Sequence, residues 1–229
     1  TDEKMQDTNV QVTPYEAGLK TVLTDGVIED DNEALIRAAG NLLGDAYELK
    51  LDQDLLARLD NATISLAGAS TTLTMGHIAA ARACLGGNAV ATGGPAPSPY
   101  VCVIHPFQEL DIVDVLTPNL STTGSSVSSY AGGLAEEALR KYSIGKLFGM
   151  PVLMDGNLTI DSSSDCKGGV FASGQRSGII YVSAREPTVK PTRDESLRGW
   201  ELFYAGRYGV GNYLNGWTVE LFADATTPD

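Results

Sequence analysis

The stretch EALIRAAGNLLGDAYELKLDQDLLARL, residues 33–59, carries the longest regular pattern in the sequence. Leucines recur in it every seven residues, at Leu35, Leu42, Leu49 and Leu56, and the same broad face is filled by Ala39, Leu43, Ala46 and Leu59. An N-cap is available just before it, at Asp30, Asp31 or Asn32. The spacing predicts a helix over 31–59, about 40 Å long at about 1.5 Å per residue, which serves as the spine of the fold.

The composition is that of a folded and strongly acidic chain. Its 229 residues are 43% hydrophobic and 20% charged, with a net charge of −13, which indicates a sizeable core. Proteins that bind nucleic acid through its phosphates need clustered Lys and Arg. If this chain acts near DNA, we therefore expect it to enclose the DNA or not to contact it. No apolar run approaches the roughly 20 residues of a membrane span.

The sequence offers no ligand set for a metal or cofactor. Cys84, Cys102 and Cys166 are odd in number and lack the close spacing of a zinc or redox motif, so we expect free thiols in a reducing compartment. Asp161 and Asp165 lie in a polar loop predicted over 161–169, without the pattern of a calcium loop. We therefore expect no cofactor.

Shorter elements follow the predicted spine. Residues 8–24 are predicted to be extended and broken near Pro14, and 74–85 to form a helix capped by Thr74. The remaining expectations are a boundary loop over 86–100, an exposed loop over 117–133, a short helix over 135–143, and a turn with a buried strand over 144–157.

The tail is aromatic and prone to form strands. Residues 200–214 and 217–224 are separated by Asn215-Gly216, which is the strongest short signal for a β-hairpin. Gly206, Gly209 and Gly211 lie inside a strand pattern, where glycines mark bends or close backbone contacts. The tail is thus predicted to be a hairpin.

The segment YVCVIHPFQELDIVDVL, residues 100–116, contains the strongest catalytic candidate. An apolar run meets His105 and Pro106, and a helix-like pattern follows. Glu109 and Asp111 are close in sequence, but any helix carries such neighbours, and a catalytic base also needs a nucleophile. We favour a structural corner at His105 and Pro106 over catalysis. His77 lacks a metal-spaced partner, and no nucleophile elbow or phosphate loop occurs.

Several segments together resemble the major capsid protein of tailed bacteriophages, with its Hong Kong 97-type fold. They are VTPYEAGLKTVLTDGVIEDDNEALIRAAGNLLGDAYELKLDQDLLARL (12–59), TTLTMGHIAAARACL (71–85), PYVCVIHPFQELDIVDVL (99–116), IGKLFGMPVLMDGN (144–157) and the aromatic tail. The resemblance implies an α+β fold with four parts. These are the returning half of an extended loop (1–24), a peripheral domain with the spine helix (25–97), an axial domain (98–186) and a second peripheral segment (187–229).

The same resemblance implies a structural role and no enzymatic activity. Copies of the chain would form the hexamers and pentamers of an icosahedral shell around double-stranded DNA, in a virion assembled in the host cytoplasm. Scaffold, maturation protease, portal and decoration proteins are the further partners it implies, and no membrane. The subunit interface would include Val10, Val12, Tyr15, Lys20, Arg207, Tyr208 and Trp217. The chain begins TDEKMQDTNV without Met, so either maturation cleaves far into the family's N-terminal part or the sequence omits it.

Three other interpretations stay open. An encapsulin, a bacterial compartment with the same fold, would hold cargo enzymes instead of DNA. A small α/β enzyme would use His105 with Glu109 or Asp111. A monomeric binding module would use the rings of the tail, at Trp200, Tyr204, Tyr208, Tyr213 and Trp217.

Overall fold

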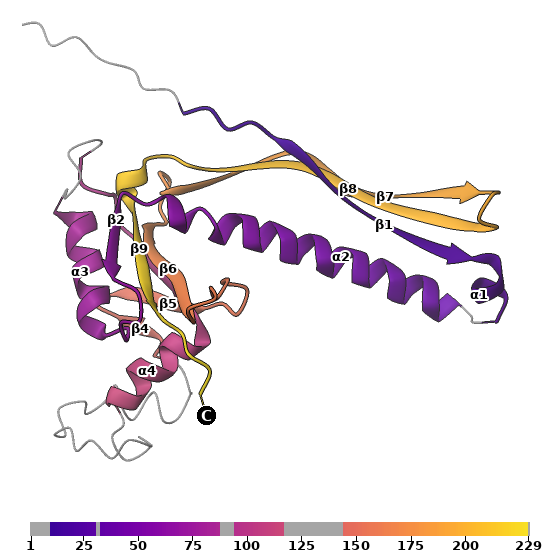
Figure 1. The fold of residues 1–229 in the computed structure, drawn as a ribbon. Coiled ribbons are helices and arrows are strands. Elements are labelled where there is room, and N and C mark those ends of the chain that lie inside the picture. Colours follow the sequence, from indigo (N-terminus) through magenta and orange to yellow (C-terminus); the bar gives the residue numbers. More distant parts are fainter. Residues whose placement is uncertain (1–9, 31–32, 88–93, 117–143, 229) are drawn as a thin grey trace, which may run out of the picture. The chain divides into compact units, whose positions relative to one another are not determined.

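The computed structural model describes residues 10–30, 33–87, 94–116 and 144–228. The chain forms two compact units (Figure 1). Unit 1 comprises Thr1–Asp54 and Tyr181–Gly211, and unit 2 comprises Leu55–Ile180 and Asn212–Asp229. The predicted loops and helix over 117–143, and the predicted N-cap at Asp31 or Asn32, lie outside the described residues.

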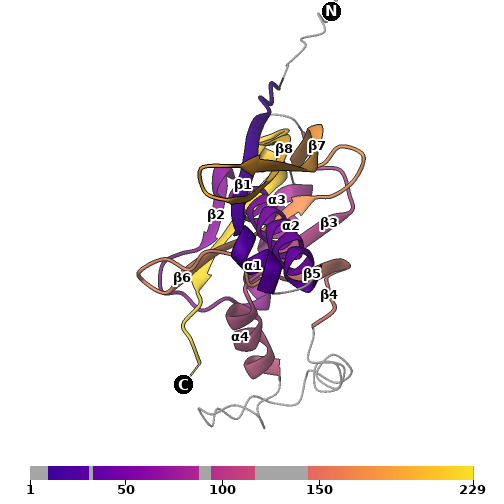
Figure 2. The ribbon, with the colours of Figure 1, turned by 90° about the vertical axis from the view of Figure 1, so that its right-hand side faces the viewer.

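Unit 1 combines one long helix with a three-stranded sheet. Its elements are β1 (Tyr15–Thr24), α1 (Asp25–Asp30), α2 (Glu33–Leu56), β7 (Ile179–Asp194) and β8 (Gly199–Asn212). The strand order is β1-β8-β7, and β1 runs antiparallel to β8 with Tyr15 opposite Tyr208. The sheet lies along one side of α2 in both views (Figures 1 and 2). The prediction of extended chain broken near Pro14 is confirmed for β1.

The predicted spine helix is present, but it ends at Leu56 and not at Leu59. A short 3₁₀ helix, η1 (Leu59–Asn61), follows. Leu59 is 1% exposed and belongs to a small core with Val103 and Cys166. Because the chain leaves the helical path after Leu56, the side chain of Leu59 can be buried in that core. This burial explains why the helix ends earlier than predicted.

The side of α2 that is buried within the chain is not the side of the heptad leucines. Leu43 and Tyr47 are only 7% and 4% exposed, whereas Leu42 and Leu49 are 69% and 44% exposed. Adjacent helical residues differ by about 100° around the axis, so the two sides are distinct. The heptad is real, but it is not what packs against the sheet.

Unit 2 is built around a six-stranded mixed sheet in the order β2-β9-β6-β3-β5-β4. The strands are β2 (Ile64–Ala67), β3 (Tyr100–Ile104), β4 (Lys146–Leu147), β5 (Met150–Met154), β6 (Asp165–Ala172) and β9 (Thr218–Asp224). Helix α3 (Met75–Gly86) packs on β6 and β9, and α4 (Pro106–Leu116) follows β3. The main core includes Ile78, Ile104, Ile112, Val170 and Leu221. None of the described helices is long and apolar enough to cross a membrane.

Two local predictions in unit 2 are confirmed. Thr74 is the N-cap of α3, in a capping box that His77 completes. The predicted turn and strand over 144–157 are β4 and β5, joined at Phe148 and Gly149, both with positive φ. The strand is buried only in part, since Leu153 and Met154 are exposed. All three cysteines are free, and Cys102 and Cys166 are buried.

The predicted hairpin at Asn215-Gly216 is wrong. Strand β8 pairs with β1 and β7, whereas β9 pairs with β2 and β6, so the two lie in different sheets. Residues Asn215–Trp217 form a 3₁₀ turn, η2, between them. Local turn chemistry favours a hairpin, but β9 is buried along nearly its whole length as an inner strand, and that burial outweighs the turn.

Two further predictions differ from the structure. The polar loop expected over 161–169 gives way to β6 from Asp165, because Cys166, Gly168 and Gly169 are buried between β3 and β9. The expected boundary between 186 and 187 falls inside β7, which runs through Pro187 and Pro191. The bounds of the two units therefore differ from those of the domains expected over 25–97, 98–186 and 187–229.

Gly168 is a position where unit 2 has no room for a side chain. A Cβ there would lie 2.5 Å from the carbonyl oxygen of Val103 on the neighbouring strand. We expect Gly168→Ala to lower the free energy of unfolding by about 1–3 kcal/mol, because the strands must separate. Urea unfolding followed by tryptophan fluorescence measures it. Gly156→Ala is the control, since nothing lies within 4 Å of its Cβ position; equal losses in the two variants would contradict the explanation.

Candidate functional site

The carboxylate of Asp54, near the end of α2, joins the helix of unit 1 to two strands of its sheet. Its Oδ2 accepts hydrogen bonds from the hydroxyls of Tyr208, at 2.7 Å, and Tyr15. Lys50, one turn earlier, donates to Oδ1 at 2.7 Å. Tyr15 and Tyr208 face each other across β1 and β8, with ring centroids 5.0 Å apart. We call Tyr15, Lys50, Asp54 and Tyr208 the tyrosine–aspartate node.

The node holds Asp54 in its charged form. Burial alone raises the pKa of Asp54, but the hydrogen bonds from Lys50, Tyr15 and Tyr208 together bring it below the ordinary value. The pKa of Tyr208 is raised, first by burial and then by its hydroxyl and carboxylate neighbours. An ionised acceptor bonded to two neutral donors is a stable arrangement at neutral pH.

Glycines let the sheet approach α2 and the residues that precede β1. A Cβ on Gly206 would lie 2.2 Å from the Tyr47 hydroxyl oxygen. The ring of Tyr47 also meets Tyr204 and Tyr208 edge-on, at 5.2 and 5.9 Å. At Gly209 and Gly211, a Cβ would lie 2.9 Å from the methyl groups of Val12. The prediction of close backbone contacts is confirmed at Gly206 and Gly209, whereas the close neighbour of Gly211 is a side chain.

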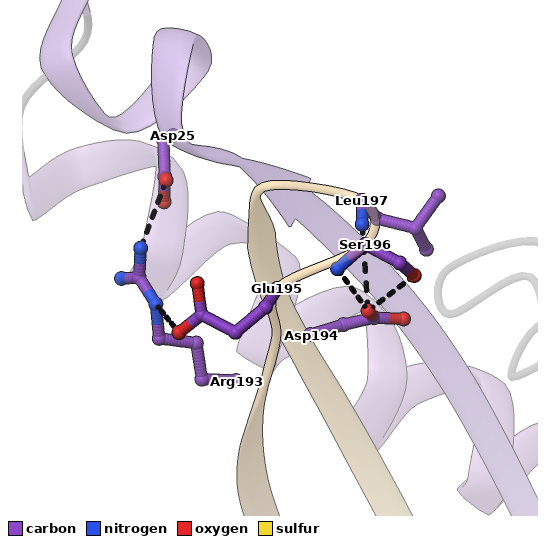
Figure 3. A network of polar contacts seen from close by, with 6 residues as sticks. All are labelled: Asp25, Arg193, Asp194, Glu195, Ser196 and Leu197. Atoms are coloured by element: carbon purple, nitrogen blue, oxygen red, sulfur yellow. Dashed lines mark hydrogen bonds and ion pairs between the residues drawn. The ribbon is translucent and has the colours of Figure 1, made fainter.

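The turn between β7 and β8 is fixed by a second polar network (Figure 3). Its residues are Asp25, Arg193, Asp194, Glu195, Ser196 and Leu197. Arg193 donates to Asp25 at 3.1 Å and to Glu195 at 2.8 Å. Asp194 Oδ1 accepts from the backbone and hydroxyl of Ser196 at 2.8 and 2.6 Å. These bonds join the turn to the first residue of α1.

Five of the seven predicted interface residues keep some exposed surface. Val10 and Tyr15 are 41% and 40% exposed, and Arg207 is also exposed. The Lys20 side chain is 50% exposed while it pairs with Glu201. Val12 is half-buried against β8. All five lie along β1, the residues before it, or β8 in unit 1.

The other two predicted interface residues need correction. Tyr208 is 1% exposed because it is part of the tyrosine–aspartate node. Trp217 is 5% exposed, lies in the core of unit 2, and donates its indole N–H to the Gly94 carbonyl at 3.2 Å. Both rings are therefore buried by contacts within the chain. Tyr208 belongs to unit 1 and Trp217 to unit 2.

His105 lies between β3 and α4 and is 6% exposed. Its Nδ1 accepts the Phe107 backbone N–H at 3.2 Å, and its ring meets the Phe107 ring edge-on at 4.7 Å. The backbone N–H of His105 donates to Gln108 Oε1 at 3.2 Å. Burial lowers the pKa of His105, and Asp155 partly opposes this. The neutral ring therefore acts as an acceptor for the first turn of α4.

The acidic neighbours of His105 in sequence have other surroundings. Glu109 is 3% exposed and accepts the Ile144 N–H at 3.1 Å. Burial raises the pKa of Glu109, and the bond from Ile144 opposes it. Burial, with Asp224 and Asp114 nearby, raises the pKa of Asp111 to about 6. Among the described residues, no three His, Cys, Asp or Glu side chains form a group that could hold a metal ion.

Sequence reasoning did not identify Asp54 or Tyr47. Tyr47, Lys50 and Asp54 are spaced by three and four residues and so share one side of a helix. A tyrosine and a charged pair on the side adjoining Leu43 were the available signal. The prediction instead rested on the leucine heptad, which lies on another side of the helix.

Comparison with known proteins gives the family. The family described as phage capsid protein matches residues 7–219. A chain from Mycobacterium phage Che8 is 21% identical with a TM-score of 0.73, over 96% of this chain and 75% of that one. A capsid chain of Ralstonia phage GP4 is 10% identical, with a TM-score of 0.68, over 95% and 75%. An encapsulin from Synechococcus elongatus is 9% identical, with a TM-score of 0.63, over 95% and 76%. No curated protein matches the chain.

The fold is that of a Hong Kong 97-type shell protein, as its structural neighbours show. The chain belongs to the phage capsid protein family. It is a major capsid protein of a tailed phage and a component of the virion. It is thus a structural protein and not an enzyme, so the hypothesis of an enzyme using His105 is set aside.

We expect Asp54→Asn to lower the free energy of unfolding by about 1–3 kcal/mol, because hydrogen bonds to a charged acceptor become weaker neutral ones. Thermal and urea unfolding measure the loss.

The same carboxylate makes stability depend on pH. Since the folded pKa of Asp54 is depressed, its contribution to the free energy of unfolding is full above about pH 4 and is lost as pH falls through the folded pKa. The variant should lack that part of the acid sensitivity. Asp45→Asn, exposed on the same helix, is the control and should change stability by under about 0.5 kcal/mol; a matching loss there would refute a special role for the node.

We expect His105→Ala to lower the free energy of unfolding by about 1–3 kcal/mol, because the Phe107 N–H loses its acceptor. His105→Asn should recover part of the loss, since an Asn oxygen can accept the N–H two residues on. Urea unfolding of both variants tests this. Equal losses would mean that only the packing of the ring matters.

Proposed function

We propose that copies of this chain form the hexamers and pentamers of a closed icosahedral shell that encloses double-stranded DNA, in virions assembled in the host cytoplasm. The observation that carries this proposal is the capsid family match over residues 7–219, on a fold shared with phage capsid chains. Scaffold, maturation protease, portal and decoration proteins are the partners that such a shell would use.

The charge of the chain supports enclosure of DNA without adhesion to it. The net charge is −13, so the duplex and the shell repel each other on average. Several cations are also paired within unit 1: Lys20 with Glu201, Arg185 with Glu16, and Arg193 with Asp25. Such a lining would leave DNA free to enter and leave.

The open edges of the sheet in unit 1 support contacts between subunits. Strands β1 and β7 are the outer strands of this three-stranded sheet. Each presents backbone donors and acceptors that a neighbouring copy can pair with. Val10, Val12, Tyr15, Lys20 and Arg207 remain the proposed interface residues. Residues 1–24 would act as an extended loop, beside peripheral and axial domains.

An encapsulin-type compartment is the second candidate. The similarity to the Synechococcus elongatus encapsulin covers 95% of this chain, so the fold is compatible with a shell around cargo proteins. The phage capsid family match favours the first candidate. What the particles contain would separate the two.

We expect the purified protein to form megadalton particles or rings, and not 24.1 kDa monomers. Closed shells are stable because symmetry repeats many moderate contacts. Light scattering with negative-stain electron microscopy measures this on protein produced with its complete gene. A monomer under these conditions would contradict assembly, and particles filled with protein but lacking nucleic acid would favour the compartment.

A further inference from the structure

Three of the four heptad leucines of α2 form an apolar stripe that the rest of unit 1 leaves open, whereas the fourth, Leu56, packs against the core around Leu59. Leu42 is the most exposed large apolar residue of the described chain, at 69%, and Leu49 is 44% exposed. Leu35 continues the stripe one heptad earlier and is half-buried. We call Leu35, Leu42 and Leu49 the leucine stripe.

The sheet does not use this side of the helix. Tyr47 and Asp54 contact β1 and β8, and Leu43 is buried on the same side of the helix. Figure 2 shows α2 nearly end-on, with β1, β7 and β8 on one side of it. A solvated helix needs one apolar face for its own core, so a second one calls for another partner.

The spacing of the stripe indicates the shape of that partner. Ala39 and Ala46 lie between the three leucines, so apolar residues alternate at spacings of four and three. This is the 3.5-residue period of a coiled-coil seam, which keeps facing a second helix along its length. An extended strand has a repeat of two and would meet only part of the stripe. The occupant that fits is therefore a helix.

The charge beside the stripe indicates the chemistry of that helix. Asp45 lies three residues after Leu42 and four before Leu49, so it borders the stripe. Asp54 and Lys50 are paired in the tyrosine–aspartate node, and of the other charged residues of α2 four are acidic and one is basic. Pairing with the same helix of a second copy would bring like charges together, whereas a basic helix would be attracted.

We propose that the leucine stripe binds an amphipathic helix of another protein, with apolar residues at heptad spacing and Lys or Arg beside them. This site goes beyond shell assembly and does not depend on it, because the stripe lies within one unit of a single chain.

The test uses fluorescently labelled synthetic helices of about three heptads, with leucine in the seam and lysine beside it. Fluorescence anisotropy measures their binding to the full chain. We expect the lysine peptide to bind at least about tenfold more tightly than the same peptide with glutamate replacing lysine. The pair Leu42→Gln and Leu49→Gln should weaken binding by at least about tenfold, and Asp45→Lys should reduce the preference for lysine.

The matched control is Leu197→Gln, at an exposed leucine (51%) in the turn between β7 and β8. It should leave binding unchanged, and thermal unfolding should show that every variant is folded. No binding of either peptide, equal binding of both, or an equal loss in the control would overturn the proposal. It would also fail if the chain self-associated in sedimentation and the double glutamine variant did not, because the occupant would then be a second copy.

Discussion

Unit 1 depends on one carboxylate that is shared between its helix and its sheet. The carboxylate of Asp54 in α2 accepts hydrogen bonds from the hydroxyls of Tyr15 in β1 and Tyr208 in β8. Hydrogen bonds to a charged group contribute about 1.5–3 kcal/mol each, whereas the Lys50 pair one turn away contributes only about 0.3–0.5 kcal/mol. The two tyrosines therefore dominate. They tie elements more than 150 residues apart in the chain, as the separation of Asp54 and Tyr208 shows.

The hydrogen bonds of Asp54 can form because the sheet of unit 1 lies close to α2. A side chain on Gly206 would occupy the place of the Tyr47 hydroxyl, and side chains on Gly209 and Gly211 would displace Val12. Glycine weakens a strand by roughly 0.5–1 kcal/mol relative to alanine, so these positions lower local stability. The hydrogen bonds of Asp54 and the packing of the tyrosine rings outweigh that cost. The glycines inside β8 thus follow from the short distance between sheet and helix.

The sequence predicted those features that rest on local chemistry. The N-cap at Thr74, the turn before β5, the close contacts at the glycines and most of the spine helix follow from spacing and turn residues. The failures depend on distant partners. Asn215-Gly216 signals a hairpin, yet β9 joins another sheet, and Trp217 has its indole bond to Gly94. Asp54 was missed because its donors come from two strands far away in sequence.

Many polar and charged side chains of unit 1 are paired with one another within the chain. These pairs determine which surface is available for contacts with other molecules. The tyrosine–aspartate node uses one side of α2, and ion pairs within the chain engage Lys20, Arg185 and Arg193. In the described part of unit 1, the surfaces that stay open include the backbone at the edges of β1 and β7, the leucine stripe of α2, and exposed apolar side chains of β7 and β8 such as Val189 and Phe203. Paired strand edges give many contacts of moderate strength, which suits a shell whose stability comes from closure. The exposed leucines are a separate apolar surface on a rigid helix, so a second protein can bind there without competing for the strand edges.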